Sequence, residues 1–308
     1  MGTVIDDSVA LRMKASSLAQ RIGSALVLLP IIITLIWWSP WAVVASVAVL
    51  VVVGLSELHG AFTHLAHPPQ TYRFSLVLGA LIALSFLFAI VAEALSGIVL
   101  TPLVASLAVI ISLSLALRQH TRQPVLIEWA LGLGAALYIS VLSAHLVLMR
   151  LIETPLNPSP LSNLGLSSGA AWLYLACVIT WLQDAMAYFV GKRWGHTKMA
   201  PVLSPNKTWE GAAGGLFGAV IGSLATVWLC GLPLNPLLAI ILGLAGGVVG
   251  PLGDLAESMI KRHAGLKDVG HLIPGHGGML DRVDALLFAT PVVYYMILLF
   301  LYLGAHNN

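Results

Sequence analysis

The sequence predicts an all-α integral membrane protein with about nine transmembrane helices. Of the 308 residues, 58% are hydrophobic and only 9% are charged, whereas a soluble domain is about 25% charged. Apolar runs of about 20 residues recur along the whole chain, and an α-helix needs about this length to cross a hydrocarbon core roughly 30 Å thick. The runs are continuous rather than alternating, which favours helices over the strands of a membrane barrel.

The apolar runs divide the chain into two helical regions. We expect membrane spans at residues 21–38, 40–62, 74–95, 97–117, 129–149, 170–190, 211–230, 236–256 and 284–304. Residues 1–20 form a polar N-terminal arm, residues 21–150 hold about five helices, and residues 170–304 hold about four. Two polar loops, at residues 191–210 and 257–284, interrupt the second region.

The basic residues predict the orientation of these spans. If the N-terminus is cytoplasmic, nine spans place 14 of the 15 Lys and Arg residues on the cytoplasmic side and only Arg150 outside. Cytoplasmic loops of membrane proteins carry this excess of positive charge. The N-terminal arm and both polar loops are therefore expected to face the cytoplasm.

Composition excludes several other kinds of function. The net charge of +2 is too small to indicate nucleic-acid binding, and no basic and aromatic tract supports it. Cys177 and Cys230 both lie inside apolar runs. Neither a disulfide framework nor a zinc site is therefore expected.

Residues 253–284 concentrate charge in an otherwise apolar chain. They contain five of the 13 acidic residues and four of the 15 Lys and Arg residues. Asp254 falls at the end of the eighth span, where a carboxylate costs a few kcal/mol unless it is paired or metal-bound. If the helix continues past this point, Asp254, Ser258 and one base of the Lys261–Arg262 pair share one face.

A second pair of acids opens the last span. Asp281 and Asp284 are three residues apart, so they project together from the start of a helix. With Asp254 they could bind one or two Mg²⁺ ions, which prefer oxygen ligands. The alternative is a network of salt bridges at the membrane surface with four bases, namely Lys261, Arg262, Lys267 and Arg282.

A glycine-rich turn lies between these acids, at residues 274–278. Consecutive glycines such as Gly277 and Gly278 let backbone N–H groups converge on a phosphate, and neighbouring Lys and Arg side chains would neutralise its charge. The alternative is a flexible turn. In the same way, His276 could donate to a phosphate or simply cap the turn.

The sixth and seventh spans predict a second polar site. Asp184 lies near the cytoplasmic end of the sixth span, and Ser204, Lys207 and Thr208 crowd the start of the seventh. The N-terminal N–H groups of a helix favour anions. The alternative is an ordinary basic cytoplasmic loop. Glu57, near the cytoplasmic end of the second span, could contribute to the same polar region.

Residues 258–284 closely resemble the signature of the phosphatidate cytidylyltransferases, also called CDP-diacylglycerol synthases. The matching pattern is Ser258-x-Ile260-Lys261-Arg262-x4-Lys267-Asp268-x-Gly270-x2-Ile273-Pro274-x-His276-Gly277-Gly278-Met279-x-Asp281-Arg282-Val283-Asp284, without a departure over 27 positions. Two upstream segments, at residues 184–188 and 204–211, are similar to further blocks of the family. They depart from it at Met186 and Asn206. The resemblance covers about residues 170–290.

The resemblance implies that phosphatidate and CTP react to give CDP-diacylglycerol and pyrophosphate. It also implies an all-helical, Mg²⁺-dependent enzyme of the inner membrane that forms a homodimer, and a monovalent cation such as K⁺ can share the metal centre. By the same resemblance, the metal-binding acids are Asp254, Asp281 and Asp284. The residues that hold phosphates or complete the pocket are Asp184, Ser204, Lys207, Thr208, Ser258, Lys261, Arg262, Lys267, Asp268, His276, Gly277, Gly278 and Arg282.

Two other functions fit parts of the pattern. A CTP-dependent polyprenol or phytol kinase would transfer the γ-phosphoryl group of CTP to an alcohol. A cation-coupled transporter would also keep acids inside its spans, but those acids should be spread across the midplane of the membrane. In this chain they gather on one side near the C-terminus.

Overall fold

The computed structural model describes residues 23–24, 26–65, 72–118, 125–270, 272 and 277–306. Within these residues the chain is almost entirely helical, which confirms the predicted all-α membrane fold. Among the described residues, seven helices are long and apolar enough to cross a membrane: Pro40–Phe62, Leu76–Ser96, Val125–Arg150, Ser168–Trp194, Trp209–Cys230, Pro236–His263 and Leu280–Gly304. Two shorter apolar helices, Leu26–Trp38 and Thr101–Leu117, occupy the positions of the predicted first and fourth spans. The N-terminal arm at residues 1–20 lies outside the described residues.

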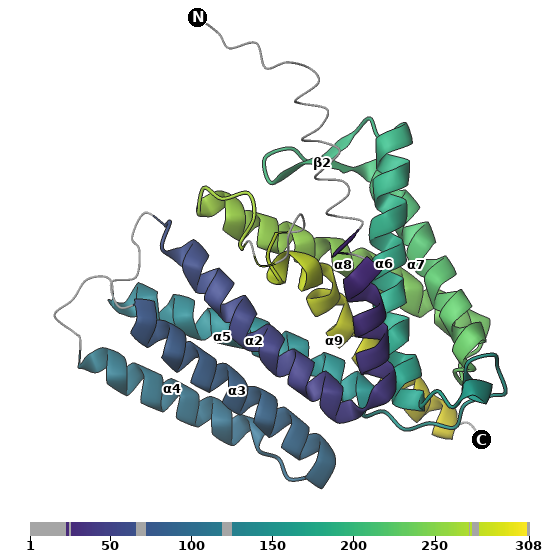
Figure 1. The fold of residues 1–308 in the computed structure, drawn as a ribbon, viewed down its shortest axis with the longest axis horizontal. Coiled ribbons are helices and arrows are strands. Elements are labelled where there is room, and N and C mark those ends of the chain that lie inside the picture. Colours follow the sequence, from purple (N-terminus) through teal and green to yellow (C-terminus); the bar gives the residue numbers. More distant parts are fainter. Residues whose placement is uncertain are drawn as a thin grey trace, which may run out of the picture.

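The helices form two groups that meet in the centre of the molecule. The first group contains α2 (Pro40–Phe62), α3 (Tyr72–Ser96), α4 (Thr101–Leu117) and α5 (Val125–Arg150). The second contains α6 (Ser168–Trp194), α7 (Trp209–Cys230), α8 (Pro236–His263) and α9 (Leu280–His306), preceded by a short 3₁₀ turn, η1 (Ser162–Leu164). Figure 1 shows α2–α5 side by side, with α8 and α9 between them and the α6–α7 pair. Helix α9 contacts both groups.

Local sequence signals fix where several helices begin. The side chain at each of these starts accepts a hydrogen bond from a backbone N–H of the first turn, which would otherwise lack a partner. Proline at the first helical position supports two of the starts, Pro40 and Pro236. The capping residues are Ser39 for α2, Ser167 for α6, Thr208 for α7 and Asn235 for α8.

Helices α6 and α7 pack closely because glycines line the facing side of α7. A side chain at Gly218 would collide with the carbonyl of Leu182 and the side chain of Met186 on α6. The same face carries Gly211, Gly214, Gly215 and Gly222. Small residues allow this close approach, and van der Waals packing between the backbones then stabilises helix pairs in membranes.

The second region differs from the predicted boundaries in two places. Helix α8 continues through Pro251 to His263, and α6 continues to Trp194, so both extend beyond the apolar runs that predicted them. The segment after α6 is a hairpin of two antiparallel strands, β1 (Lys198–Ala200) and β2 (Ser204–Thr208), rather than an irregular loop. Hydropathy marks only the membrane-buried part of a helix. The last turns of α8 carry charged residues that form ion pairs, and the end of α6 packs against α7 and β2.

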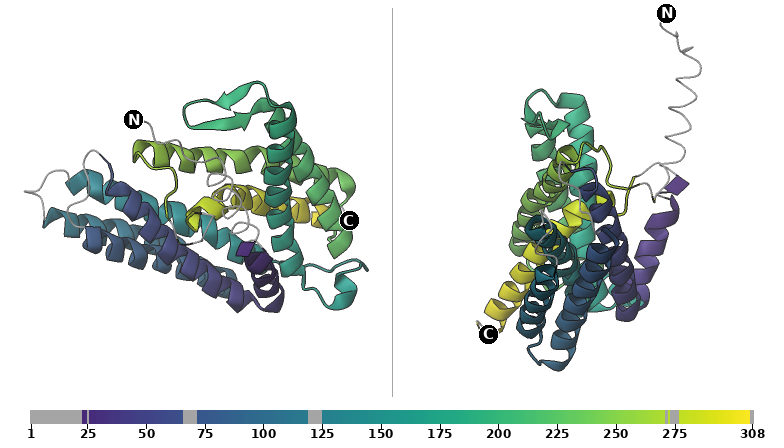
Figure 2. Two further views of the ribbon diagram at one scale, coloured as in Figure 1. Left: turned by 45° about the horizontal axis from the view of Figure 1, so that its top comes forward. Right: turned by 90° about the vertical axis from the view of Figure 1, so that its left-hand side faces the viewer.

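The charged ends of the helices gather at one end of the molecule. The hairpin at the end of α6 projects beyond the helices (Figure 2), and Arg262 near the end of α8 donates to the carbonyl of Leu203 in its turn. The opposite end is held by other contacts. There, Arg150 donates to the carbonyl of Ile36, and Asn157 donates to that of Gly231.

Candidate active site

The site begins at a close approach between α8 and α9. Gly253 faces the start of α9, and a Cβ atom at this position would collide with the carbonyl oxygen of Asp284. Only glycine permits this approach. The next residue on α8 is Asp254, so the close contact brings the charged part of α8 beside the first turns of α9.

Lys261 joins two acids across this contact. Its Nζ lies 2.7 Å from Asp281 Oδ1 and 3.2 Å from Glu257 Oε2. The three side chains are 11%, 3% and 0% exposed respectively, so the ion pairs are shielded from water. Such pairs are stable only when hydrogen bonds satisfy the remaining oxygen atoms. Asp281 Oδ2 meets this need, because it accepts from the N–H groups of Val269 and Gly278 at 3.2 and 2.9 Å.

Lys207 joins the hairpin to the same end of α8. Its Nζ lies 2.7 Å from Asp254 Oδ2 and donates to the carbonyl of Pro251 at 3.3 Å. Ser258 Oγ donates to Asp254 Oδ1 at 3.3 Å. The prediction that Asp254 and Ser258 share a face of a continued helix is therefore confirmed. The two polar segments expected from the sequence meet in one place.

Glu257 is the acid that the sequence analysis did not assign. Its side chain is fully buried, and its Oε1 atom has no hydrogen-bond donor among the described residues. Its carboxyl group lies near that of Asp284 and interacts electrostatically with it. The spacing of four residues between Glu257 and Lys261 is the signal that could have identified it.

We refer to Asp254, Glu257, Asp281 and Asp284 as the acid cluster. Two lysines, Lys207 and Lys261, form ion pairs with three of its members. Glu257 and Asp284 are neighbouring buried carboxyl groups, and a nearby cation favours the charged form of such groups. The donor set therefore suits a hard cation.

The described residues contain no group of three or more Asp, Glu, His or Cys side chains that converges closely enough to hold a metal ion. Each of the two lysines contacts one of the predicted ligands, Asp254 or Asp281. The metal-binding role of Asp254, Asp281 and Asp284 stays a prediction.

Several other predicted residues lie around the acid cluster. Asp184 is exposed near the end of α6 and interacts electrostatically with Asp254, Asp284, Lys207 and Arg282. These groups from α6, β2, α8 and α9 thus face a common region. Arg282, at the start of α9, and Lys267, in the loop before it, have exposed side chains.

Other predicted residues make hydrogen bonds that stabilise the local fold around the site. Thr208 is buried and caps α7 by accepting from the N–H of Gly211, whereas Ser204 begins β2. Arg262 donates to the carbonyls of Leu203 and Leu266 and so links the hairpin to α8.

The loop before α9 holds the last group. The side chain of Asp268 lies close to Gly277, and the next residue, Gly278, is buried. The N–H of Gly278 is bonded to Asp281, so this amide already has an acceptor. His276, predicted to contact phosphate, falls outside the described residues.

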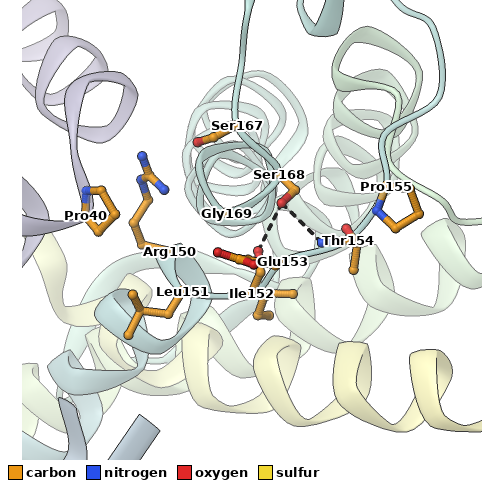
Figure 3. Close-up of a pocket in the computed structure, with 10 residues that line it drawn as sticks. All are labelled: Pro40, Arg150, Leu151, Ile152, Glu153, Thr154, Pro155, Ser167, Ser168 and Gly169. Carbon is orange, nitrogen blue, oxygen red and sulfur yellow. Dashed lines mark hydrogen bonds between the residues drawn. The ribbon is translucent and has the colours of Figure 1, made fainter. Parts of the chain in front are cut away.

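A surface cavity of about 500 Å³ lies at the opposite end of the molecule (Figure 3). It is lined by the end of α5, the segment after it and the start of α6, including Arg150 and Ser168. Ser168 Oγ accepts from the N–H of Thr154 and donates to the carbonyl of Ile152. These groups join α5 to α6, and no member of the acid cluster lines the cavity.

Comparison with known proteins identifies the family. Residues 19–300 match the Cytidylyltransferase family, which is nearly the whole chain. The chain belongs to the cytidylyltransferase family. It is therefore a membrane nucleotidyltransferase, and the resemblance inferred from residues 258–284 is confirmed.

Three relatives of this cytidylyltransferase family member carry the name phosphatidate cytidylyltransferase. The protein from Synechocystis sp. is 31% identical over 295 residues, which cover 92% of this chain and 97% of that protein. The protein from Bacillus subtilis is 46% identical over 134 residues, or 43% of this chain and 49% of that protein. The protein from Brucella abortus is 48% identical over 119 residues, or 38% and 43%. The chain thus matches about half the length of the more identical relatives.

Proposed function

We propose that this cytidylyltransferase transfers the cytidylyl group of CTP to phosphatidate, giving CDP-diacylglycerol and pyrophosphate for phospholipid biosynthesis. The observation that carries the proposal is the convergence of the motifs on one site. The Lys207–Asp254 and Lys261–Asp281 pairs join β2, α8 and α9 at a single end of the helices. Relatives that match the chain carry the name of this activity.

The chemistry of the reaction fits a site that holds basic and acidic groups together. An oxygen of the phosphatidate phosphate attacks the α-phosphorus of CTP, a new P–O bond forms, and the bond to the β-phosphate oxygen breaks so that pyrophosphate leaves. The attacking phosphate is already an anion, so no general base is required. Two anions must instead be brought together, and positive side chains aimed at the developing charge lower that barrier. The residues proposed for this role are Lys207, Lys261, Arg262, Lys267, His276 and Arg282.

The acid cluster supplies the other part of the proposed site. Asp254, Asp281 and Asp284 would hold Mg²⁺, with a monovalent cation such as K⁺ nearby, and Glu257 adds an unpartnered oxygen beside Asp284. A bound Mg²⁺ supplies a Lewis acid that stabilises the departing pyrophosphate. Within this arrangement Lys261 keeps Asp281 oriented, and Ser258 does the same for Asp254.

The location of the site suits one lipid substrate and one soluble substrate. We propose that the protein lies in the inner (plasma) membrane as a homodimer, with its N-terminus and active site on the cytoplasmic side. Exposed apolar side chains cover the helices, and the acid cluster lies at the ends of α8 and α9. Phosphatidate would reach it from the bilayer and CTP from the cytoplasm.

The fate of the cytidine group tests this function. Purified protein in phosphatidate-containing liposomes is supplied with Mg²⁺ and CTP labelled in its cytidine ring. The proposal predicts that the label enters chloroform-soluble lipid only when phosphatidate is present. Release of labelled CDP, with no label in lipid, would instead indicate a kinase. If CTP stays unchanged, both enzyme activities are contradicted, and the cation-coupled transporter remains as the alternative function.

A further inference from the structure

A carboxylate from the first helical group holds the start of α9. Glu57, near the end of α2, accepts from the N–H of Met279 through Oε1 at 2.8 Å and from the N–H of Leu280 through Oε2 at 2.9 Å. Glu57 precedes Met279 by 222 positions in the chain. Glu57 is only 9% exposed. The N-terminal N–H groups of a helix lack partners within it and attract negative charge, so both bonds are of the stronger, charge-assisted kind.

The surrounding loop is shaped to admit this side chain. A Cβ atom at Gly270 would collide with the carboxyl group of Glu57, and its three nearest neighbours are all atoms of Glu57. A Cβ atom at Gly278 would lie 2.7 Å from Glu57 Oε2. Real Cβ atoms do not approach other atoms this closely. Gly270, which precedes the glycine-rich turn, and Gly278, its last residue, therefore leave room for the Glu57 carboxylate.

Glu57 acts on the same backbone segment as the acid cluster. Asp281 Oδ2 accepts from the N–H of Gly278, and Glu57 accepts from the next two N–H groups. Three consecutive amides are thus held by two carboxylates that come from different helices. Asp281 follows this segment directly, and Asp284 lies one turn further along α9.

We propose that Glu57 is a positioning residue for cytidylyl transfer, which fixes the start of α9 and thereby sets Asp281 and Asp284 against Lys261 and Asp254. The inference rests on the proposed function. Glu57 acts through the backbone of Met279 and Leu280 and not by touching substrate. A displacement of about 1 Å in a positioned catalytic group can cost roughly 100-fold in rate, so a lost backbone anchor should appear in kcat.

The chain offers a matched control in Glu93. This carboxylate also caps a helix, because its Oε2 accepts from the N–H and the hydroxyl of Thr101 at the start of α4. Helix α4 does not contribute to the acid cluster. Glu57→Gln and Glu93→Gln therefore make the same chemical change at two helix starts, of which one belongs to the site.

The test measures backbone protection and kinetics on the purified full-length protein. Hydrogen exchange of the peptide containing residues 277–284 reports the anchor, and cytidine transfer to phosphatidate gives kcat and the KM for CTP. For Glu57→Gln we expect faster exchange in this peptide and a fall in kcat of about 100-fold with little change in KM. Glu93→Gln should leave exchange in this peptide and both constants unchanged. Wild-type exchange and kcat in Glu57→Gln would overturn the inference.

A second variant keeps the inference testable if Glu57→Gln does not fold. Gly270→Ala places its Cβ atom against three atoms of the Glu57 side chain, so it should displace the carboxylate and lower kcat in the same way. In a Glu57→Ala background the collision disappears, and Gly270→Ala should then cause no further loss. Losses that multiply in the double variant would contradict the proposed contact. If the wild type transfers no cytidine, the proposed function fails, but the exchange measurement still tests the anchor.

Discussion

Lys207 and Lys261 each neutralise an acid of the cluster in different surroundings. Lys207 and Asp254 are 23% and 34% exposed, so water screens their attraction. Lys261 is 11% exposed and holds Glu257 and Asp281, which are 0% and 3% exposed. Removing one partner of a buried pair leaves the other charge without compensation. The two lysines should therefore differ in what they contribute to stability.

Lys261→Met is expected to lower the free energy of unfolding by about 3–5 kcal/mol, because two buried acids lose their cation. Lys207→Met should change it by less than about 1 kcal/mol, as for other exposed pairs. Denaturation in detergent micelles measures both. Equal effects of the two substitutions would contradict the difference in burial.

Individual site residues could be predicted from sequence only where they lie close together in the chain. The face shared by Asp254 and Ser258 follows from helical spacing, and it is confirmed. The role of Glu57 could not be predicted, because its bonding partners lie more than 200 positions away. The four-residue spacing to Lys261 could have suggested a partner for Glu257, but not its complete burial, which depends on how α9 packs against α8.

At the scale of the helices, the contact between α8 and α9 depends on Gly253. Gly253→Ala places a Cβ atom against the carbonyl of Asp284. We expect the two helices to separate, with a loss of about 1–3 kcal/mol in the free energy of unfolding and a loss of cytidine transfer. Thermal unfolding and the transfer assay measure the two effects.

Gly132→Ala is the control for this substitution. Gly132 lies inside α5, and no atom lies within 4 Å of a Cβ atom built there. Alanine at such a position stabilises a helix by up to about 1 kcal/mol. Gly253→Ala with the stability and activity of Gly132→Ala would show that the close approach is not required.

The positions of the helices could be predicted because a helix that crosses a membrane needs an apolar run as long as the hydrocarbon core is thick. All nine predicted spans coincide with apolar helices, of which seven are long enough to cross a membrane. The ends of α6 and α8 were placed too early, since their last turns are charged and are stabilised by contacts with other segments. The hairpin was not predicted, because it lies in a polar segment that hydropathy does not describe. Arg262 and Lys207, rather than hydropathy, fix its position on α8.

For the whole molecule, the positive charges predict that the hairpin faces the cytoplasm and the segment after α5 faces outward. Single cysteines test this. Val202 in the hairpin turn is 84% exposed, and Glu153 after α5 is also exposed. The native Cys177 and Cys230 are buried and should not react.

A membrane-impermeant maleimide should label Val202→Cys only in inside-out vesicles. It should label Glu153→Cys only in right-side-out vesicles. Labelling of both cysteines from one side of the membrane would contradict the single crossing by α6 that is expected between them. The reverse pattern would place the acid cluster outside and separate it from cytoplasmic CTP.

The central claim is that the acid cluster is the cation site for cytidylyl transfer. The most direct test is a Mg²⁺ titration of cytidine transfer to phosphatidate by the wild type and by Asp284→Asn, which keeps the size of the side chain but removes its charge. We predict saturable dependence on Mg²⁺ for the wild type. For the folded variant we predict a loss of at least about 100-fold in kcat, the scale on which removing one charge-stabilising group acts. Wild-type kcat and Mg²⁺ dependence in Asp284→Asn would contradict the account.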